Sequence, residues 1–143
     1  MQKSVLTFYI DGNLCAVDIT RVLEVVNSGT PTPIPCAEPY IEGLIYSRNQ
    51  GLTVINLRKK FGLAERALDK NTKVIVIEVP KPAEDNPDQV SLYGLVADEV
   101  MDVVLIDDES IAGNIKTSIP EQNIESIISH EGNNIIMLSF KDF

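Results

Sequence analysis

YIEGLIYSRNQGLTVINLR, residues 40–58, is typical of two β-strands joined by a short polar turn. The turn is predicted at residues 48–51, Arg-Asn-Gln-Gly, because Asn and Gly supply the backbone freedom that a tight hairpin needs. Apolar residues occupy both faces of the second strand, which predicts a hairpin in the centre of a sheet and not at its edge. Arg48 is the only basic residue between positions 41 and 57 and is a first functional candidate.

The length and composition of the chain predict one compact domain or two very small ones fused together. It has 143 residues, of which 44% are hydrophobic. The formal net charge of −9 argues against a nucleic-acid partner, because phosphate neutralisation needs a basic face. No apolar run is long enough to span a membrane, and the N-terminus lacks the pattern of a signal peptide. We therefore expect a cytoplasmic protein without membrane insertion.

The two cysteines do not form a recognisable motif. Cys15 lies in an apolar strand pattern and Cys36 lies in a proline-rich segment, without a CxxC pair. Both are predicted to be reduced and to pack as small hydrophobic residues.

Short strands and turn signals dominate the rest of the chain. Strands are predicted at residues 6–10, 14–17, 73–79, 91–104 and in a last hairpin over 124–140 that turns at 131–134. Asp18 is predicted to cap a short helical turn that leads into a strand ending near residue 27. Residues 30–39 contain four prolines, which favours an extended crossover, the alternative being a ligand for an aromatic groove. A short helix is predicted over 58–63, an exposed loop over 80–89, and an irregular segment over 107–122 in which a helix could start at Ser110.

Two pairs of segments indicate an internal duplication. Residues 16–26 align with 94–104, and residues 41–57 align with 124–140, each without a gap. This predicts two small β-barrels that share core, since each alone would be marginally stable. Arg48 aligns with Glu131. Either the turn at Arg48 serves something outside the fold, or exposed turn tips tolerate both charges.

The sequence offers no arrangement typical of catalysis or of a metal site. His130 is the single histidine and is predicted to be solvated beside a turn, without a nucleophile, zinc-ligand set or glycine-rich phosphate loop. An acidic run lacks the alternating ligands and the glycine of a calcium loop and is predicted to be a solvated face; it comprises Asp98, Glu99, Asp102, Asp107, Asp108 and Glu109. The interpretation is a binding protein, not an enzyme, with no cofactor.

The order of these motifs resembles the CheW-type chemotaxis coupling proteins from Leu6 to Phe140. The matching segments are LTFYIDGNLCAVDITRVLEVV, PTPIPCAEPYIEGLI, an arginine (Arg48) eight residues before Asn-Leu-Arg, KVIVIEV and YGLVADEVMDVV. The chain departs from the family pattern at the Arg48 turn. It has Ser47-Arg48-Asn49 where the family has Leu-Arg-Gly, Thr53 where the family has proline, and Asn56 where the family has aspartate.

This resemblance implies a mainly β fold of two packed, five-stranded SH3-like barrels with short helices. It implies one domain over residues 1–143, with subdomains of about 1–70 and 71–143 that could exchange strands. It also implies a non-catalytic adaptor, located at receptor arrays on the inner face of the membrane. Such an adaptor joins the cytoplasmic tip of a methyl-accepting chemotaxis receptor to the regulatory domain of a CheA-type histidine kinase.

Carried over by position, the receptor-facing group is Val22, Glu24, Gly43 and Arg48. The surrounding hairpin residues are Leu44, Tyr46, Asn49 and Leu52, which would rim Arg48 as an interface anchor. Two alternatives stay open at this point. One is a small-molecule-binding β-barrel sensor, which would need a concave pocket with convergent polar groups. The other is a divergent CheW-like scaffold in a pathway other than chemotaxis.

Overall fold

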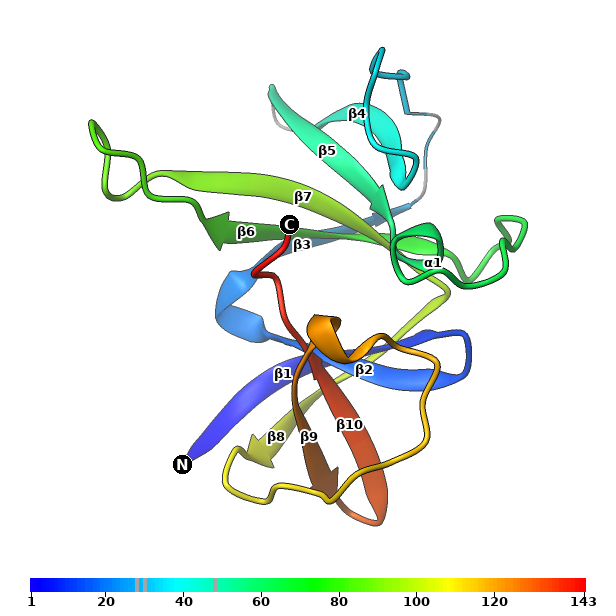
Figure 1. The fold of residues 1–143 in the computed structure, drawn as a ribbon, viewed down its shortest axis with the longest axis vertical. Coiled ribbons are helices and arrows are strands. Elements are labelled where there is room, and N and C mark those ends of the chain that lie inside the picture. The colour runs from blue at the N-terminus through cyan, green and yellow to red at the C-terminus, as the bar shows by residue number, and fades with distance from the viewer. Residues whose placement is uncertain (28, 30, 48) are drawn as a thin grey trace.

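The computed structural model describes residues 1–27, 29, 31–47 and 49–143 (Figure 1). Its strands are β1 (Gln2–Ile10), β2 (Asn13–Asp18), β3 (Val22–Asn27), β4 (Ile41–Ser47), β5 (Gln50–Asn56), β6 (Lys73–Pro80), β7 (Val90–Ala97), β8 (Glu99–Asp107), β9 (Ile124–His130) and β10 (Asn133–Leu138). Its helices are the α-helix α1 (Leu57–Lys60) and the 3-10 helices η1 (Ile19–Arg21) and η2 (Glu121–Asn123). The predicted mainly β fold class is confirmed.

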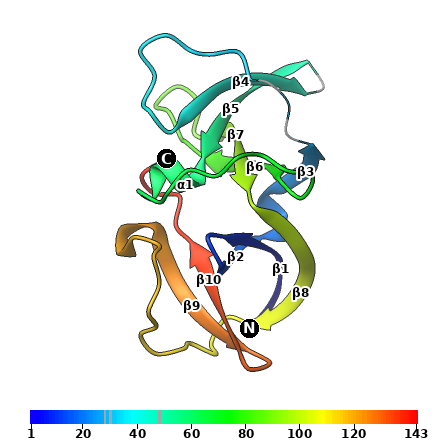
Figure 2. The same cartoon turned by 90° about the vertical axis from the view of Figure 1, so that its right-hand side faces the viewer.

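The strands form two five-stranded sheets that pack together as SH3-like barrels. Sheet A has the order β8-β1-β2-β10-β9 and sheet B has the order β3-β6-β7-β5-β4. Sheet A lies below sheet B in Figure 1, and the segment after β10 crosses from sheet A to sheet B beside α1 (Figure 2). The main core lies between the sheets, where Phe8 and Ile10 of β1 share one hydrophobic cluster with Ile75 and Leu95 of sheet B.

The two sheets repeat one arrangement, and each takes strands from both parts of the chain. β2 runs parallel to β10 in sheet A, as β7 runs parallel to β5 in sheet B. The aligned segments occupy matching places, because β2 and β3 correspond to β7 and β8, and β4 and β5 correspond to β9 and β10. After its helical turn the chain continues as β3 in sheet B, whereas β8 returns to sheet A. A cut near residue 70 would therefore divide sheet B and separate β1 and β2 from the rest of sheet A.

The hairpin at residues 40–58 is not central as predicted. β5 is an interior strand between β7 and β4, but β4 is an edge strand. Apolar residues on both faces of β5 reflect its interior place, and that signal does not extend to its hairpin partner. Ser47 pairs with Gln50, so Gln50 and Gly51 belong to β5 and not to the turn. Arg48 lies outside the described residues.

Most local predictions are confirmed, and side-chain caps explain where the helices begin. The Asp18 side chain accepts a hydrogen bond from the Thr20 amide at 2.9 Å, starting the predicted helical turn before β3. The helix predicted over 58–63 begins one residue earlier and ends at Lys60, because Asn56 caps it. The proline-rich segment is an extended crossover, held by the bridge between Thr32 and Leu44.

Two local predictions are wrong. No helix starts at Ser110, because β8 continues to Asp107 and Ile111 then forms an extended bridge with Ile128 of β9. Both cysteines are free thiols, but only Cys15 packs as a hydrophobic residue. Cys36 is exposed in a turn at φ 61°, since the proline-rich crossover runs over the surface.

Candidate interaction site

The described members of the predicted receptor-facing group lie on two different edges of sheet B. Val22 and Glu24 belong to β3, and Gly43 belongs to β4 at the opposite edge. Val22 is partly buried against the main core, and Glu24 is half-buried. The sheet order does not bring these three residues together, and their receptor contact stays a prediction.

The fold itself explains why position 43 is a glycine, independently of any partner. Its φ of +140° is a conformation that side chains disfavour, and a Cβ at this position would lie 2.2 Å from the carbonyl oxygen of Thr32. The close approach is set by the crossover, because Thr32 and Leu44 exchange two backbone hydrogen bonds of 2.8 Å. Glycine is therefore required here by the passage of the proline-rich segment over β4.

The predicted hairpin surround divides into exposed and buried members. Tyr46 is 74% exposed on β4, and Asn49 adopts φ 66° in the turn. Leu44 is half-buried beneath the crossover. Leu52 is 1% exposed, so its prediction as part of a surface rim is wrong. It belongs to the interior strand β5, where its side chain is buried.

Two apolar stripes on edge strands were not predicted from the sequence. The β3 stripe is Leu23 and Val25, which are 49% and 41% exposed. The β8 stripe is Met101, Val103 and Leu105, which are 40%, 55% and 54% exposed. Edge strands usually carry charges that prevent pairing with other chains, so exposed apolar residues on both edges indicate binding surfaces. The signal was present in the duplication, which aligns Leu23 with Met101 and Val25 with Val103.

Arg58 and Asp98 form a bidentate ion pair where the two sheets meet. Arg58 donates from Nε to Oδ1 of Asp98 at 3.0 Å and from Nη2 to Oδ2 at 2.7 Å. The same carboxylate accepts from the amide of Asp11, in the turn between β1 and β2, at 2.8 Å. The prediction that Asp98 is part of a solvated acidic face is thus wrong, because its side chain is 12% exposed. Burial by itself raises the pKa of Asp98, but the hydrogen bonds from Arg58 and Asp11 outweigh it and hold the pKa below its ordinary value.

Asn56 occupies the position at which the resemblance expects an aspartate. Its Oδ1 accepts a hydrogen bond from the Lys59 amide at 3.1 Å, which caps α1. Its Nδ2 donates to Oε1 of Glu42 at 2.9 Å, which an aspartate could not do. The amide thus keeps the cap on α1 and lacks the charge that an aspartate would bring. Burial raises the pKa of Glu42, but hydrogen bonds from Lys59 and Asn56 outweigh it and lower the pKa.

His130 is only partly solvated, with its side chain 23% exposed and Nε2 3.7 Å from Glu131. Within the described residues, no group of three or more His, Cys, Asp or Glu side chains is arranged to hold a metal ion. None of the helices in the described part of the chain has the length and apolar character to cross a membrane.

Two packed β-barrels with an exposed apolar stripe on an outer strand of each sheet have surfaces typical of a protein-binding scaffold. Comparison with known proteins gives the family: the profile of the CheW-like domain matches residues 4–143, and the chain belongs to this family.

Curated relatives include chemotaxis protein CheW of Treponema pallidum (strain Nichols), 28% identical over 139 residues, covering 96% of this chain and 79% of the relative. Chemotaxis protein CheW of Bacillus subtilis (strain 168) is 29% identical over 109 residues, covering 76% of this chain and 64% of the relative. The crystal structure of scaffolding protein TtCheW from Thermoanaerobacter tengcongensis matches with a TM-score of 0.81 and 30% identity. That match covers 98% of this chain and 86% of the other.

Proposed function

We propose that this chain is a non-catalytic adaptor that couples methyl-accepting chemotaxis receptors to the regulatory domain of a CheA-type histidine kinase. Its membership of the CheW-like family supports this role, as do relatives named chemotaxis protein CheW and a neighbour named a scaffolding protein. In this role the chain acts at receptor arrays on the cytoplasmic face of the membrane.

The observation that carries the proposal is the pair of equivalent apolar stripes. An adaptor needs two surfaces that can be occupied at once, and the β3 and β8 stripes lie on the outer strands of different sheets. The β3 stripe alternates with half-buried side chains, as in a strand that presents one face to a partner. In β8 the stripe alternates with the less exposed Val100, Val104 and Ile106, except at Asp102, which is also exposed. We assign the β8 stripe to the kinase regulatory domain.

The receptor tip is assigned to sheet B, which carries the β3 stripe at one edge and the 41–56 hairpin at the other. Val22 and Glu24 belong to the same strand as this stripe, and Tyr46 adds an aromatic side chain that is 74% exposed. The predicted contribution of Arg48 is kept within this assignment, since arginine is enriched among the residues that dominate interface energies.

The test measures each partner separately by isothermal titration calorimetry. Val103→Lys is expected to weaken binding of the kinase regulatory domain by about tenfold or more, and to leave receptor binding unchanged. Arg48→Glu is expected to do the reverse. Val90→Lys is the matched control, because Val90 is also an exposed strand valine, 44% exposed, and lies outside both stripes. Unchanged kinase binding by Val103→Lys would overturn the assignment of the β8 stripe, and failure of the unaltered chain to bind either partner would overturn the adaptor role.

A further inference from the structure

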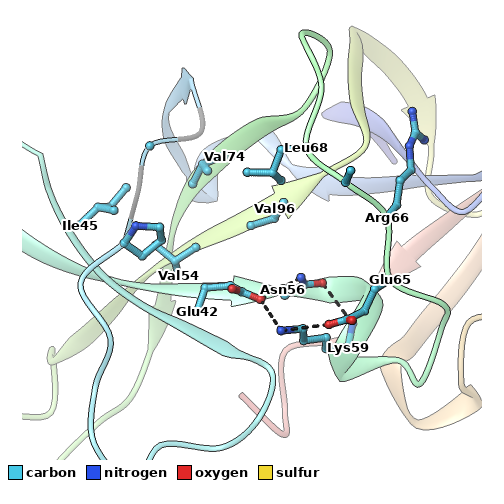
Figure 3. Close-up of a pocket in the computed structure, with 13 residues that line it drawn as sticks. Glu42, Ile45, Val54, Asn56, Lys59, Glu65, Arg66, Leu68, Val74 and Val96 are labelled. Carbon is cyan, nitrogen blue, oxygen red and sulfur yellow. Dashed lines mark hydrogen bonds and ion pairs between the residues drawn. The ribbon is translucent and has the colours of Figure 1, made fainter.

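An open pocket of about 400 Å³ lies against the interior face of sheet B and is also lined by the proline-rich crossover and the segment after α1 (Figure 3). Its apolar wall comes from β4, β5, β6, β7 and the segment before β6, and comprises Ile45, Val54, Val74, Val96 and Leu68. Leu68 is 58% exposed and lies at the mouth. The volume falls within the range of about 300–1,000 Å³ that small-molecule sites occupy.

The equivalent space in sheet A is filled by a hydrophobic cluster. That cluster contains Ala16 and Met137, which the duplication aligns with Gly94 and Val54 of sheet B. Gly94 does not line the pocket, because the side chain of Val74 lies over it. At the lining position, sheet B has the shorter Val54 where sheet A has Met137, and this smaller side chain leaves space in the interior of sheet B.

Polar side chains converge at one end of this pocket. Lys59 Nζ lies 3.0 Å from Oε1 of Glu42 and 3.2 Å from Oε1 of Glu65. The Nδ2 of Asn56 is also directed to Glu42. Two carboxylates thus share one ammonium group, which leaves an excess of negative charge and of hydrogen-bond acceptors.

Arg66 lines the pocket without neutralising this excess. Its guanidinium is turned away from the carboxylates in Figure 3. It lies 2.8 Å from Asp69 and 3.6 Å from Asp98, which are its ionic partners. The polar end of the pocket is therefore complementary to a cation or to a donor of several hydrogen bonds.

We propose that this pocket is a binding site for a small organic amine, whose apolar body lies against Val54, Val74 and Val96 and whose ammonium group binds Glu42 and Glu65. The site goes beyond the adaptor role, because its interior wall is separate from the β3 and β8 stripes, although Glu42, Ile45 and Val54 belong to the hairpin assigned to the receptor. Kinase binding through the β8 stripe and amine binding in the pocket can therefore fail independently.

The test uses hexylamine as the probe, with 1-hexanol and hexanoate as matched compounds of equal chain length. Binding is followed by ¹H–¹⁵N chemical-shift titration of the full chain. Hexylamine is expected to give saturable shifts at residues 42–68 and to bind at least several-fold more tightly than hexanoate. Glu42→Gln is expected to reduce hexylamine affinity several-fold and to leave 1-hexanol affinity unchanged.

Val54→Met fills the pocket with the residue found at the equivalent position of sheet A and is expected to abolish binding. Val90→Met is its control, at an exposed valine outside the pocket lining. Leu68→Trp narrows the mouth at an exposed position and gives a second blocking variant if Val54→Met does not fold. Absence of saturable shifts with hexylamine, equal binding by the blocked variants, or tighter binding of hexanoate would each overturn the proposal. Retained kinase and receptor binding by Val54→Met would show that the adaptor role stands separately.

Discussion

The guanidinium of Arg58 faces the carboxylate of Asp98 through two parallel hydrogen bonds of 3.0 and 2.7 Å, and each side chain is 12% exposed. Arg58 lies in α1, directly after the hairpin. Asp98 lies between β7 of sheet B and β8 of sheet A. Asp11 joins them from the first turn of sheet A, with Oδ1 3.3 Å from Nη1 of Arg58. The pair therefore holds the junction at which the chain passes from one sheet to the other.

Removal of the Asp98 charge is expected to destabilise the fold. Asp98→Asn removes the bidentate carboxylate from the Arg58 guanidinium in a largely buried site and leaves only the longer 3.3 Å contact with Asp11, so it should lower the free energy of unfolding by about 2–4 kcal/mol. Urea unfolding followed by circular dichroism measures this change. Asp102→Asn is the matched control on exposed β8 and should change the free energy by less than about 0.5 kcal/mol. A similarly small effect of Asp98→Asn would show that the pair does not contribute to stability.

The same pair should make stability depend on acid pH. The pKa of Asp98 is below its ordinary value of about 3.9, so its stabilising contribution is fully present above that value. It is lost as the pH falls through the lowered native pKa. The difference in Tm between the unaltered chain and Asp98→Asn should be constant from pH 5 to 7 and should shrink below about pH 4. A difference that grows on acidification would give the opposite sign and contradict the lowered pKa.

Asn56→Asp restores the residue that the family pattern expects and is nevertheless expected to destabilise this chain. The cap on α1 would be retained, but two carboxylates would meet where Nδ2 of Asn56 now donates to Glu42 at 2.9 Å. We expect a loss of about 1–2 kcal/mol at pH 7. In a Glu42→Gln background the loss should be smaller, and a double-mutant cycle measures the coupling. Additive effects would show that Asn56 and Glu42 do not interact.

Gly43→Ala is expected to lower the stability of the fold, whether or not Gly43 contacts a partner. The added Cβ would overlap the Thr32 carbonyl, and the φ of +140° is strained for alanine, so a loss of about 2–4 kcal/mol is expected. Gly113→Ala serves as the control, because nothing lies within 4 Å of the position of its Cβ. Unchanged stability of Gly43→Ala together with weaker receptor binding would favour a direct contact at Gly43 over the structural role.

The two thiols should differ in reactivity. Burial raises the pKa of Cys15 to about 12, whereas Cys36 is exposed. A chromogenic disulfide reagent at pH 8 should titrate one thiol in the native chain and two in denaturant, and Cys36→Ser should remove the fast one. Rapid reaction of two thiols in the native chain would contradict the burial of Cys15.

Several features of the site could be read only in part from the sequence. The Asn56 cap was predictable because capping depends on residues three positions apart. Asp98 was misjudged because its neighbours in the acidic run are solvated, and because its partner Arg58 is 40 residues away in the chain. Leu52 was wrongly predicted to lie on a surface rim, because the sequence pattern of a hairpin does not show which of its two strands lies in the interior of the sheet.

The sequence by itself determined the strands, most of the turns, the duplication and the family, because these depend on local spacing and on the order of motifs. Only the tertiary structure decided that the chain changes sheet before β3 and again before β8, and that both of these strands expose apolar residues. It also decided that the interior of sheet B holds a pocket where sheet A is filled. The physical reason is that strand pairing and side-chain packing join residues far apart in the chain. A local sequence pattern does not specify which distant residues a strand or side chain will contact.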